Sequence, residues 1–505
     1  MSVAGTARDE GGGEASMVGG AIFEHARRAP GRLALIHNGR AFSYGAFAGR
    51  ILAARDRFEA SGLSGGGYAV LQVYDLLDYW TFSLALRDLG LTTVATPSPA
   101  AIPGLGLEDV RCVVRNEREI WPDLERICAE GGLPLDTVSL APDATAAPPP
   151  RAERPETPGH VLLTSGTTGN YKKVLRTQAF DAAFNRRSAP LLGIGRDSIV
   201  CLFDFAPWTG VGYNLAVTAW DCGGAVVTEQ GERHRPLRIP GLTHALAIPG
   251  MLSELLAAPQ EAYAPNPDLR FFVCGGSMTR AQIAQAKARI TPRLFDLLGS
   301  TETGETACTP LETDDDRRWL RPVPGRVIEI VDEEDRPVAD GELGQMRIDA
   351  SESSSGYLGD EEATKAFFRN GFFYPGDLAV RRADGRFALR GRATDVINIM
   401  GNKVSPAPIE ERLRDALGVD GVCLFSMPDA AGEEQIHVVI ESPAPPDVAG
   451  LAPILAAHLR GFPSARVHHV RRLPRNHMGK LLRQAARAQA LASDQRAPAA
   501  QEADA

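Results

Sequence analysis

An α/β architecture is predicted for most of this 505-residue chain. Short apolar segments that resemble strands alternate with helix-like segments such as 280–290, and the strand-like segments are 199–203, 225–228, 269–273 and 294–298. Alternation of strands and helices is typical of a largely parallel sheet with helices packed on it. A chain of this length also exceeds what one hydrophobic core usually organises, so we expect at least two domains.

The pattern changes towards the C-terminus. From 343 to 390, short strand-like segments and the Asp384-Gly385 turn predict a small β-rich subdomain. Beyond Arg392, a helix over 409–417, further strands and a basic helical end at 481–490 predict a small domain. The expected fold class is therefore a large N-terminal α/β domain with a β-rich subdomain, followed by a small C-terminal α+β domain.

Both ends of the chain differ in composition from the rest. Residues 1–17 and 491–505 are rich in Gly, Ala, Asp and Gln, which predicts disordered tails. We place the N-terminal domain at 18–391 and the C-terminal domain at 392–490.

The composition is that of an ordinary soluble globular protein, with 44% hydrophobic and 23% charged residues. A net charge of −9 and a pI near 5.7 argue against a nucleic-acid partner, which would call for a basic stripe. The N-terminus lacks the basic and then apolar pattern of a signal peptide, and no apolar run is long enough to span a bilayer. Seven dispersed cysteines without C-x-x-C spacing predict reduced, mostly buried thiols. We therefore expect a soluble, cytoplasmic protein.

The most informative segment follows the apolar run 161–163. Small hydroxyl and glycine residues gather there ahead of Lys172, namely Thr164, Ser165, Gly166, Thr167, Thr168 and Gly169. Such a loop lets backbone N–H groups approach a polyphosphate, while hydroxyls donate to its oxygens and a lysine offsets its charge. It is not a Walker A loop, because no glycine directly precedes Lys172 and no Ser or Thr follows it. The alternative interpretation is a turn between two strands.

Four further motifs follow in order along the chain. They are Leu298-Gly299-Ser300-Thr301-Glu302, Tyr374-Pro375-Gly376-Asp377, Gly391-Arg392-Ala393-Thr394-Asp395 and Pro474-Arg475-Asn476-His477-Met478-Gly479-Lys480. Together with the loop they resemble the motifs of the adenylate-forming superfamily, which includes acyl- and aryl-CoA ligases, peptide-synthetase adenylation domains, luciferases and certain amide synthetases. The resemblance runs from about Ala21 to about Arg487 and implies an enzyme that activates a carboxylic acid with ATP.

In this chemistry a carboxylate oxygen attacks the α-phosphorus of ATP and expels pyrophosphate, so positive charge and Mg²⁺ must bring two anions together. The resemblance implies that Lys172 and the loop hydroxyls hold the departing phosphates, and that Lys480 stabilises the transition state. It makes Glu302, with Thr168, the Mg²⁺ site, because one carboxylate with phosphate oxygens and water suits this ion.

The resemblance also implies the nucleotide contacts. Asp377 would accept hydrogen bonds from the ribose hydroxyls, and Arg392 would contact the ribose or a phosphate. The other nucleotide-binding residues implied are Gly299, Ser300, Thr301, Gly275, Gly276 and Ser277. For the last three, a structural turn is the alternative.

An acyl pocket is expected around 203–213, a second segment rich in aromatic residues. The resemblance implies that it is lined by Phe205, Trp208, Gly212 and Tyr213, together with Gly275 and Gly276. The aromatic side chains favour a flat aromatic or heteroaromatic acid. Trp208 and Tyr213 are equally consistent with core positions.

Asp204 bears on the acceptor of the acyl group. In the family, many CoA ligases have an aromatic or histidine side chain at its place. Amino-acid adenylation domains have an Asp in or next to this place, which pairs with the substrate ammonium. Amide synthetases resemble the chain in a third way, because they have an acid near the acyl adenylate that can deprotonate an amine. An Asp that caps the following turn is the structural alternative. An amine acceptor is our leading interpretation, with CoA or a carrier-protein thiol as the alternatives.

The chain departs from the family pattern at several positions. Leu298 replaces an adenine-stacking tyrosine, while Tyr171 and Lys173 replace a proline and a glycine. Thr394 replaces the Asp on which the domain hinge usually pivots. None of these changes removes a charged group that adenylation needs, so we expect an active enzyme rather than an inactive binding protein on the same fold.

The family mechanism implies movement of the C-terminal domain. This domain must supply Lys480 for adenylation and then present another face for acyl transfer, so we expect it to rotate about 392–395.

Overall fold

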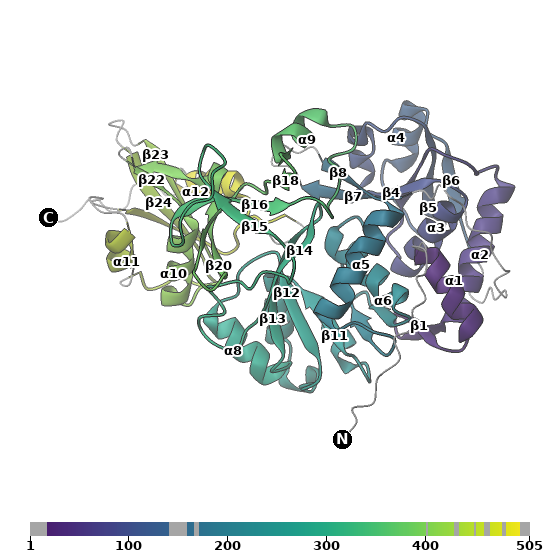
Figure 1. Cartoon of the computed structure of the whole chain (residues 1–505), viewed down its shortest axis with the longest axis horizontal. Helices are drawn as coiled ribbons and strands as arrows, with labels where there is room; N and C mark the ends of the chain where they lie inside the picture. The colour runs from purple at the N-terminus through teal and green to yellow at the C-terminus, as the bar shows by residue number, and fades with distance from the viewer. Residues whose placement is uncertain are drawn as a thin grey trace, which may run out of the picture. The chain divides into compact units, whose positions relative to one another are not determined.

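The computed structural model describes residues 18–140, 159–165, 171–399, 402–428, 434–448, 451–458, 465–476 and 481–494 (Figure 1). It confirms the predicted mixed α/β class. The described residues divide into two compact units, which we call unit 1 (18–231 with 352–361) and unit 2 (232–351 with 362–494). The predicted domains at 18–391 and 392–490 divide the chain differently and stay a prediction.

A mostly parallel sheet in unit 1 carries the strands on either side of the predicted phosphate loop. Its strand order is β6-β5-β3-β4-β7-β8. All neighbours pair in parallel except β7 and β8, which form an antiparallel pair. The strands are β3 (Tyr68–Gln72), β4 (Thr92–Ala95), β5 (Val110–Asn116), β6 (Leu135–Val138), β7 (His160–Ser165) and β8 (Tyr171–Arg176).

A second set of strands in unit 1 has the order β9-β10-β1-β2, and only the β1–β2 pair is antiparallel. These strands are β1 (Leu33–His37), β2 (Arg40–Ser43), β9 (Ile199–Cys201) and β10 (Ala225–Thr228). The predicted strand at 225–228 is confirmed to the residue. The one predicted at 199–203 ends early, because Phe203 has φ +50° and a strand residue cannot adopt that conformation.

Four helices of unit 1 begin at side chains that cap their free N–H groups. Ser43, Asp75, Thr177 and Thr209 each accept a hydrogen bond from the first turn of the helix that follows. The helices are α1 (Val18–Arg28), α2 (Tyr44–Ala60), α3 (Leu76–Asp88), α4 (Leu124–Gly131), α5 (Gln178–Leu192) and α6 (Gly210–Asp221).

The core of unit 1 is built around α3, nearly all of whose residues are buried. Trp80 of α3 meets Trp220 of α6 edge to face, with ring centroids 4.9 Å apart. The ring of Tyr213 also contacts Trp80, with centroids 5.7 Å apart and an interplanar angle of 27°. Aromatic contacts of this kind stabilise more than burial of their area alone. They fix α6 and the turn ahead of it.

The first part of unit 2 continues the α/β pattern. Its strands have the order β14-β13-β12-β11, parallel except for the β13–β14 pair. The elements are β11 (His244–Ala247), α7 (Pro249–Ala257), β12 (Arg270–Cys274), α8 (Arg280–Arg289), β13 (Leu294–Ser300) and β14 (Gly304–Pro310). The helix predicted at 280–290 is confirmed as α8, which opens with a capping box between Thr279 and Gln282.

An antiparallel sheet confirms the predicted β-rich segment. Its order is β17-β18-β16-β19-β20, with β15 paired to β16. The elements are β15 (Ile328–Val331), β16 (Leu343–Asp349), α9 (Glu361–Phe367), β17 (Phe368–Arg369), β18 (Phe372–Phe373), β19 (Asp377–Arg381) and β20 (Phe387–Arg392).

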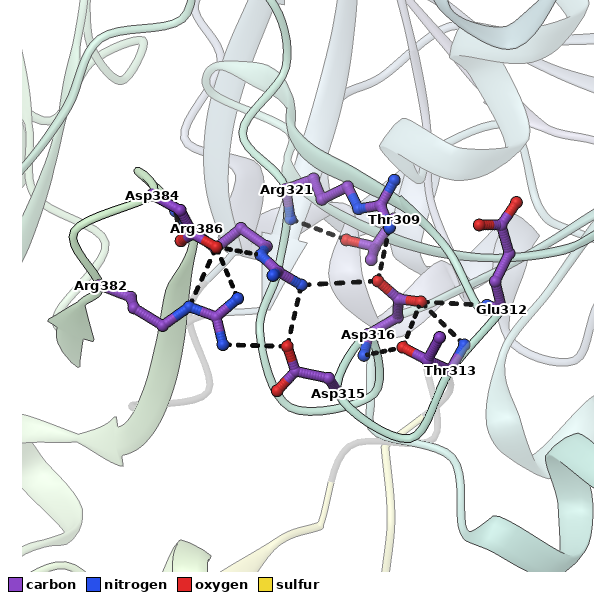
Figure 2. A network of polar contacts seen from close by, with 9 residues as sticks. All are labelled: Thr309, Glu312, Thr313, Asp315, Asp316, Arg321, Arg382, Asp384 and Arg386. Carbon is purple, nitrogen blue, oxygen red and sulfur yellow. Dashed lines mark hydrogen bonds and ion pairs between the residues drawn. The ribbon is translucent and has the colours of Figure 1, made fainter.

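A polar network joins the loop after β14 to the turn between β19 and β20 (Figure 2). Asp316 accepts hydrogen bonds from the backbone N–H and the hydroxyl of Thr313, both at 2.8 Å, and from Arg321 at 2.6 Å. Arg382 and Arg386 of the turn bind Asp315 at 2.9 and 3.1 Å. The network holds the 312–321 loop in one conformation.

The C-terminal part of unit 2 has the predicted α+β composition. A hairpin of β21 (Ile397–Ile399) and β22 (Asn402–Val404) precedes a sheet of order β23-β24-β25. Its elements are α10 (Ala407–Leu417), β23 (Gly421–Pro428), β24 (Glu434–Glu441), α11 (Leu451–His458), β25 (Ala465–Val470) and α12 (Arg483–Asp494). The last helix runs to Asp494, past the predicted end of the domain at 490.

Short 3-10 helices complete the description, at Pro99–Ala101, Pro103–Leu105, Arg235–Arg238, Gln260–Ala262 and Ala393–Asp395. None of the helices in the described part of the chain combines the length and apolar character that crossing a bilayer requires. All seven cysteines lie among the described residues as free thiols, and only Cys222 and Cys308 are not fully buried. The predicted tail at 1–17 and most of the one at 491–505 lie outside these residues.

Candidate active site

The antiparallel β7–β8 pair brings the two ends of the predicted phosphate loop together. Thr164 lies opposite Lys172, and Ser165 lies opposite Tyr171. The tip of the loop, with the predicted residues Gly166, Thr167, Thr168 and Gly169, lies outside the described residues. The strands therefore make Thr164 and Lys172 cross-strand neighbours where the loop begins and ends.

The two lysines of β8 make different contacts. The ammonium of Lys172 lies over the ring of Tyr357, 4.9 Å from its centroid. Lys173 donates a hydrogen bond to the carbonyl oxygen of Leu105, and its burial lowers the pKa of its ammonium. Its backbone oxygen accepts from the N–H of Leu358 at 2.8 Å. Lys173, at the family's glycine position, thus has a structural role.

The segment predicted to form the acyl pocket begins with a strained residue. Phe203 is almost fully buried and has φ +50°, a conformation rare for a bulky side chain. The next residue, Asp204, is half-buried, and Phe205 is 4% exposed. The Trp208 carbonyl accepts a hydrogen bond from Leu163 N at 2.9 Å, which ties this segment to β7. Backbone strain at Phe203 beside the half-buried carboxyl of Asp204 is a pattern that clusters at functional sites.

Trp208 presents an unusual polar group. Its side chain is half-buried against the apolar cluster of the parallel sheet. Its indole Nε1 is buried and has no hydrogen-bond acceptor among the described residues. A buried indole N–H normally has a partner, so this group suits a ligand acceptor.

Gly212 and Tyr213, at the start of α6, pack against or follow directly on the 203–208 segment. A Cβ atom on Gly212 would lie 2.3 Å from the Ala206 oxygen, so only glycine fits under the turn. The Tyr213 side chain is fully buried, and its hydroxyl donates to Asp181 at 2.7 Å and accepts from Arg87 at 2.9 Å. This burial favours the core interpretation of Tyr213 over direct substrate contact.

His160 packs against the same part of the chain, through Tyr213 and the Pro207 oxygen. Its ring stacks on Tyr213 with centroids 4.8 Å apart and an interplanar angle of 11°. Burial, and then the charge of Arg87, lower the pKa of His160 to about 3. The imidazole is therefore neutral at physiological pH and adds no charge next to Pro207 and Tyr213.

The glycine turn after β12 lies on the surface of unit 2. Gly275 has φ +80°, which a side chain would strain, and a Cβ on Gly276 would lie 3.3 Å from Pro249 Cγ. Ser277 accepts a hydrogen bond from Arg414 of α10 at 3.1 Å. The turn is thus both conformationally special and exposed, as a ligand-binding turn must be.

The β13–β14 turn carries the second predicted motif. A Cβ on Gly299 would lie 2.8 Å from the Gly304 oxygen, and Ser300 accepts from the Thr303 N–H at 3.1 Å. Thr301 is half-buried and Glu302 is 7% exposed. The tight turn therefore buries the carboxylate predicted to bind Mg²⁺. Among the described residues, no group of three or more His, Cys, Asp or Glu side chains could hold a metal ion alone.

Asp377 and Arg392 lie opposite each other at one end of β19 and β20. The Arg392 guanidinium is 2.8 Å from Asp377 Oδ1 and donates to the Pro375 oxygen at 2.5 Å. The structure brings together two side chains that the sequence motifs placed only separately. In the hinge, Thr394 is exposed, while Asp395 accepts from Arg483 of α12 at 2.9 Å. Lys480 lies outside the described residues.

Sequence reasoning missed two residues. Asp296 lies within β13, two positions before Leu298, and burial raises the pKa of Asp296 to about 7. In the part of the chain that the structure describes, its carboxyl has no hydrogen bond or ion pair. The available signal was a single acid inside the apolar run 294–298. Tyr357 is the second, and only its contact with Lys172 reveals it.

Residues 22–358 match the family AMP-binding, described as AMP-binding enzyme. The chain therefore belongs to this family, and the predicted resemblance is confirmed. Within it the chain is an AMP-forming carboxylate ligase.

Three proteins that this chain is similar to carry names with different acceptors of the acyl group. The chain is 29% identical over 399 residues to the fatty acid–[acyl-carrier-protein] ligase ScoC of Streptomyces coeruleorubidus, which covers 73% of this chain and 75% of that one. It is 26% identical over 484 residues to the sulfoacetate–CoA ligase of Cupriavidus necator, with 88% and 92% covered. The amide bond synthetase McbA from Marinactinospora thermotolerans matches its fold with a TM-score of 0.77 at 20% identity, with 93% and 99% covered.

Proposed function

We propose that this protein joins an aromatic or heteroaromatic carboxylic acid to an amine, with an acyl-AMP intermediate. The carboxylate oxygen attacks the α-phosphorus of ATP and pyrophosphate leaves. The amine nitrogen then attacks the acyl carbon, an amide bond forms and AMP leaves. The observation that carries the proposal is the half-buried Asp204 directly after the strained Phe203, on the segment tied to β7.

The proposed adenylation chemistry is mostly electrostatic. Lys172 and the hydroxyls of Thr164, Ser165, Thr167 and Thr168 would hold the departing phosphates. Lys480 would neutralise charge as it builds at the α-phosphate. Bound Mg²⁺ would supply further positive charge, with Glu302 as its carboxylate and Thr168 beside it, and this ion needs few protein ligands because phosphate oxygens and water complete its shell.

The proposed nucleotide site lies on unit 2. The Asp377 carboxylate would accept from the ribose hydroxyls, and its ion pair with Arg392 orients it. Gly299, Ser300 and Thr301, and the exposed turn of Gly275, Gly276 and Ser277, would contact the nucleotide and the acyl group.

The acceptor step requires a base, because an amine arrives as an ammonium and must lose a proton before it attacks. Asp204 would take that proton. Phe205 and the half-buried Trp208 would contact the acid, whose oxygen or ring nitrogen the free indole N–H suits. Gly212 and Tyr213 would hold this segment in place.

A C-terminal domain over 392–490 that rotates about 392–395 is part of the proposal. The first step needs Lys480 near the α-phosphate, and the second needs space for the acceptor. Within that domain, the Arg483–Asp395 ion pair joins the hinge to α12, so the two would move together.

A CoA ligase is the second candidate, and a different observation favours it. A cavity of about 530 Å³ in unit 2 is lined by Arg233, Arg472 and Arg475. Arg233 and Arg475 already pair with Glu254 at 3.0 Å and Glu441 at 2.5 Å. Guanidinium groups bind phosphates well, and CoA carries phosphates that a simple amine lacks. A carrier-protein thiol is the third acceptor to test.

The experiment compares products from a panel of acids offered with ATP and CoA, simple amines, or neither, by mass spectrometry. Asp204→Asn keeps the shape of the side chain but cannot take a proton, so acyl-AMP should accumulate while amide yield falls by about 10²-fold or more. Asp197→Asn is the matched control, because that side chain is 95% exposed.

Two outcomes would redirect the proposal. Unchanged amide formation by Asp204→Asn, or thioester as the only enzymatic product, would leave the CoA ligase in its place. Loss of affinity for amino acids alone would mean that Asp204 binds a substrate ammonium instead.

A further inference from the structure

Residues 352–361 belong to unit 1, although the chain on both sides of them belongs to unit 2. Contacts with unit 1 hold this segment along its length. Glu352 pairs with Arg187 of α5 at 2.8 Å, and Leu358 donates its N–H to the Lys173 oxygen at 2.8 Å. The segment therefore lies beside β8, the strand that leaves the phosphate loop.

Tyr357 is the residue that this segment brings to the loop. Its side chain is 6% exposed, so the ring itself is well fixed. The Lys172 ammonium lies over the ring face, 4.9 Å from the centroid, within the distance at which cation–π attraction acts. A lysine side chain in solution samples many rotamers, and a fixed ring beneath it removes much of that freedom before a ligand arrives.

An aromatic ring is a suitable partner for a lysine that must bind phosphate. A carboxylate would hold the ammonium more strongly, but its charge would oppose the approach of a polyphosphate. The ring is neutral, so it orients the ammonium without adding a negative charge of its own.

The neighbouring Lys173 bears on which face of β8 the Lys172 side chain takes. Neighbouring side chains on a strand point to opposite faces, so Lys172 and Lys173 lie on opposite sides of β8. The Lys173 ammonium is bonded to the Leu105 oxygen on its side. This hydrogen bond and the backbone pairing of β8 with β7 both favour the arrangement in which Lys172 lies on the side of Tyr357.

We propose that Tyr357 is a positioning residue that preorganises Lys172 for the polyphosphate of ATP through a cation–π contact. The inference rests on the proposed function only in that Lys172 is taken to bind phosphate. It gives a role to a residue of the 352–361 segment, which the chain contributes to unit 1 between two stretches of unit 2.

The test measures ATP binding to the full chain by calorimetry, since this needs no knowledge of the acid. Tyr357→Leu should weaken ATP by about 3- to 30-fold, equivalent to about 0.7–2 kcal/mol. Tyr357→Phe keeps the ring and should retain most of the affinity. Tyr74→Leu is the matched control for the substitution, because Tyr74 is 62% exposed.

A further series separates the ring's electrostatics from its packing. Phenylalanines with increasing fluorination at position 357 keep the ring shape and weaken its attraction for cations, so ATP affinity should fall with each fluorine while thermal stability stays level. In the Lys172→Met background the same series should have no effect on ATP affinity, which a merely structural role would not predict.

Two kinds of result would reject the role of Tyr357, and they can be told apart. Equal affinity of the Leu and Phe variants, or an affinity that does not follow fluorination, overturns the inference even if Lys172→Met abolishes ATP binding. Failure of the wild type to bind ATP at all would instead reject the proposed function, and this inference with it.

Discussion

Replacing Arg317 by Met should destabilise helix α10 by about 2 kcal/mol. The Arg317 side chain is 5% exposed and donates to Glu411 at 2.6 Å and to Asp415 at 2.8 Å, both on α10. Arg317 directly follows Asp315 and Asp316, whose network fixes the loop (Figure 2). The backbone that carries Arg317 is therefore part of a loop that its own polar network fixes.

The magnitude follows from the contacts. Two charge-assisted hydrogen bonds contribute about 4 kcal/mol in total. The two carboxylates are 33% and 21% exposed, so water replaces about a quarter of that when the arginine is lost. Arg317 Nε is buried with no acceptor among the described residues, and its removal returns about 1 kcal/mol. About 2 kcal/mol remains.

Hydrogen exchange of the α10 amides is the suitable assay, because a chain of two units need not unfold in one transition. The variant should exchange about 30-fold faster in α10, the equivalent of about 2 kcal/mol. Arg318→Met is the control, since that neighbouring side chain is exposed. A double-mutant cycle with Glu411→Gln then isolates the pair.

Two results would refute this reasoning. One is exchange in the Arg317 variant that matches the Arg318 variant within about 0.5 kcal/mol. The other is a coupling energy near zero in the cycle, which would mean that the ion pairs do not hold the helix.

Two further predictions concern positions within strand β13 and helix α6. Because burial raises the folded-state pKa of Asp296 to about 7, its folded form keeps a proton that the unfolded form loses, so wild-type stability should fall as pH rises from about 4 to 7. Asp296→Asn should remove that fall, with a gain that grows to at most about 4 kcal/mol above pH 7, whereas a pH-independent difference in thermal unfolding would contradict it. Gly212→Ala should cost about 1–3 kcal/mol in thermal unfolding, since its methyl would lie 2.3 Å from the Ala206 oxygen. Gly195→Ala, whose methyl meets nothing within 4 Å, should cost far less, and equal melting of the two variants would argue that the turn simply moves.

The elements of the α/β layers were predictable because their signals are local. The apolar run 225–228 is β10, and the Thr279–Gln282 capping box marks the start of α8. Apolar periodicity and caps depend on neighbouring residues only, so one sequence carries enough information.

The candidate site was less predictable because its contacts are distant in the chain. Tyr213 and Trp208 look alike in the sequence. In the structure the Tyr213 hydroxyl is bonded in the core to Asp181 and Arg87, while the Trp208 indole N–H has no acceptor among the described residues. The ring of Tyr357 meets Lys172 only because the chain returns to unit 1 late. Tertiary packing, which a single sequence does not encode locally, decides both.

The return of residues 352–361 makes unit 1 a discontinuous module, and this limits how the protein can be dissected. A fragment cut after Gly231 would lose Tyr357, the N–H that Leu358 gives to β8, and the Glu352 partner of Arg187. The complementary fragment, from 232 onwards, would carry residues 352–361 without the unit 1 residues on which they pack. Chimeras between relatives should therefore exchange this segment together with the N-terminal half, because a single crossover near 231 would pair the β8 strand of one parent with the segment of the other.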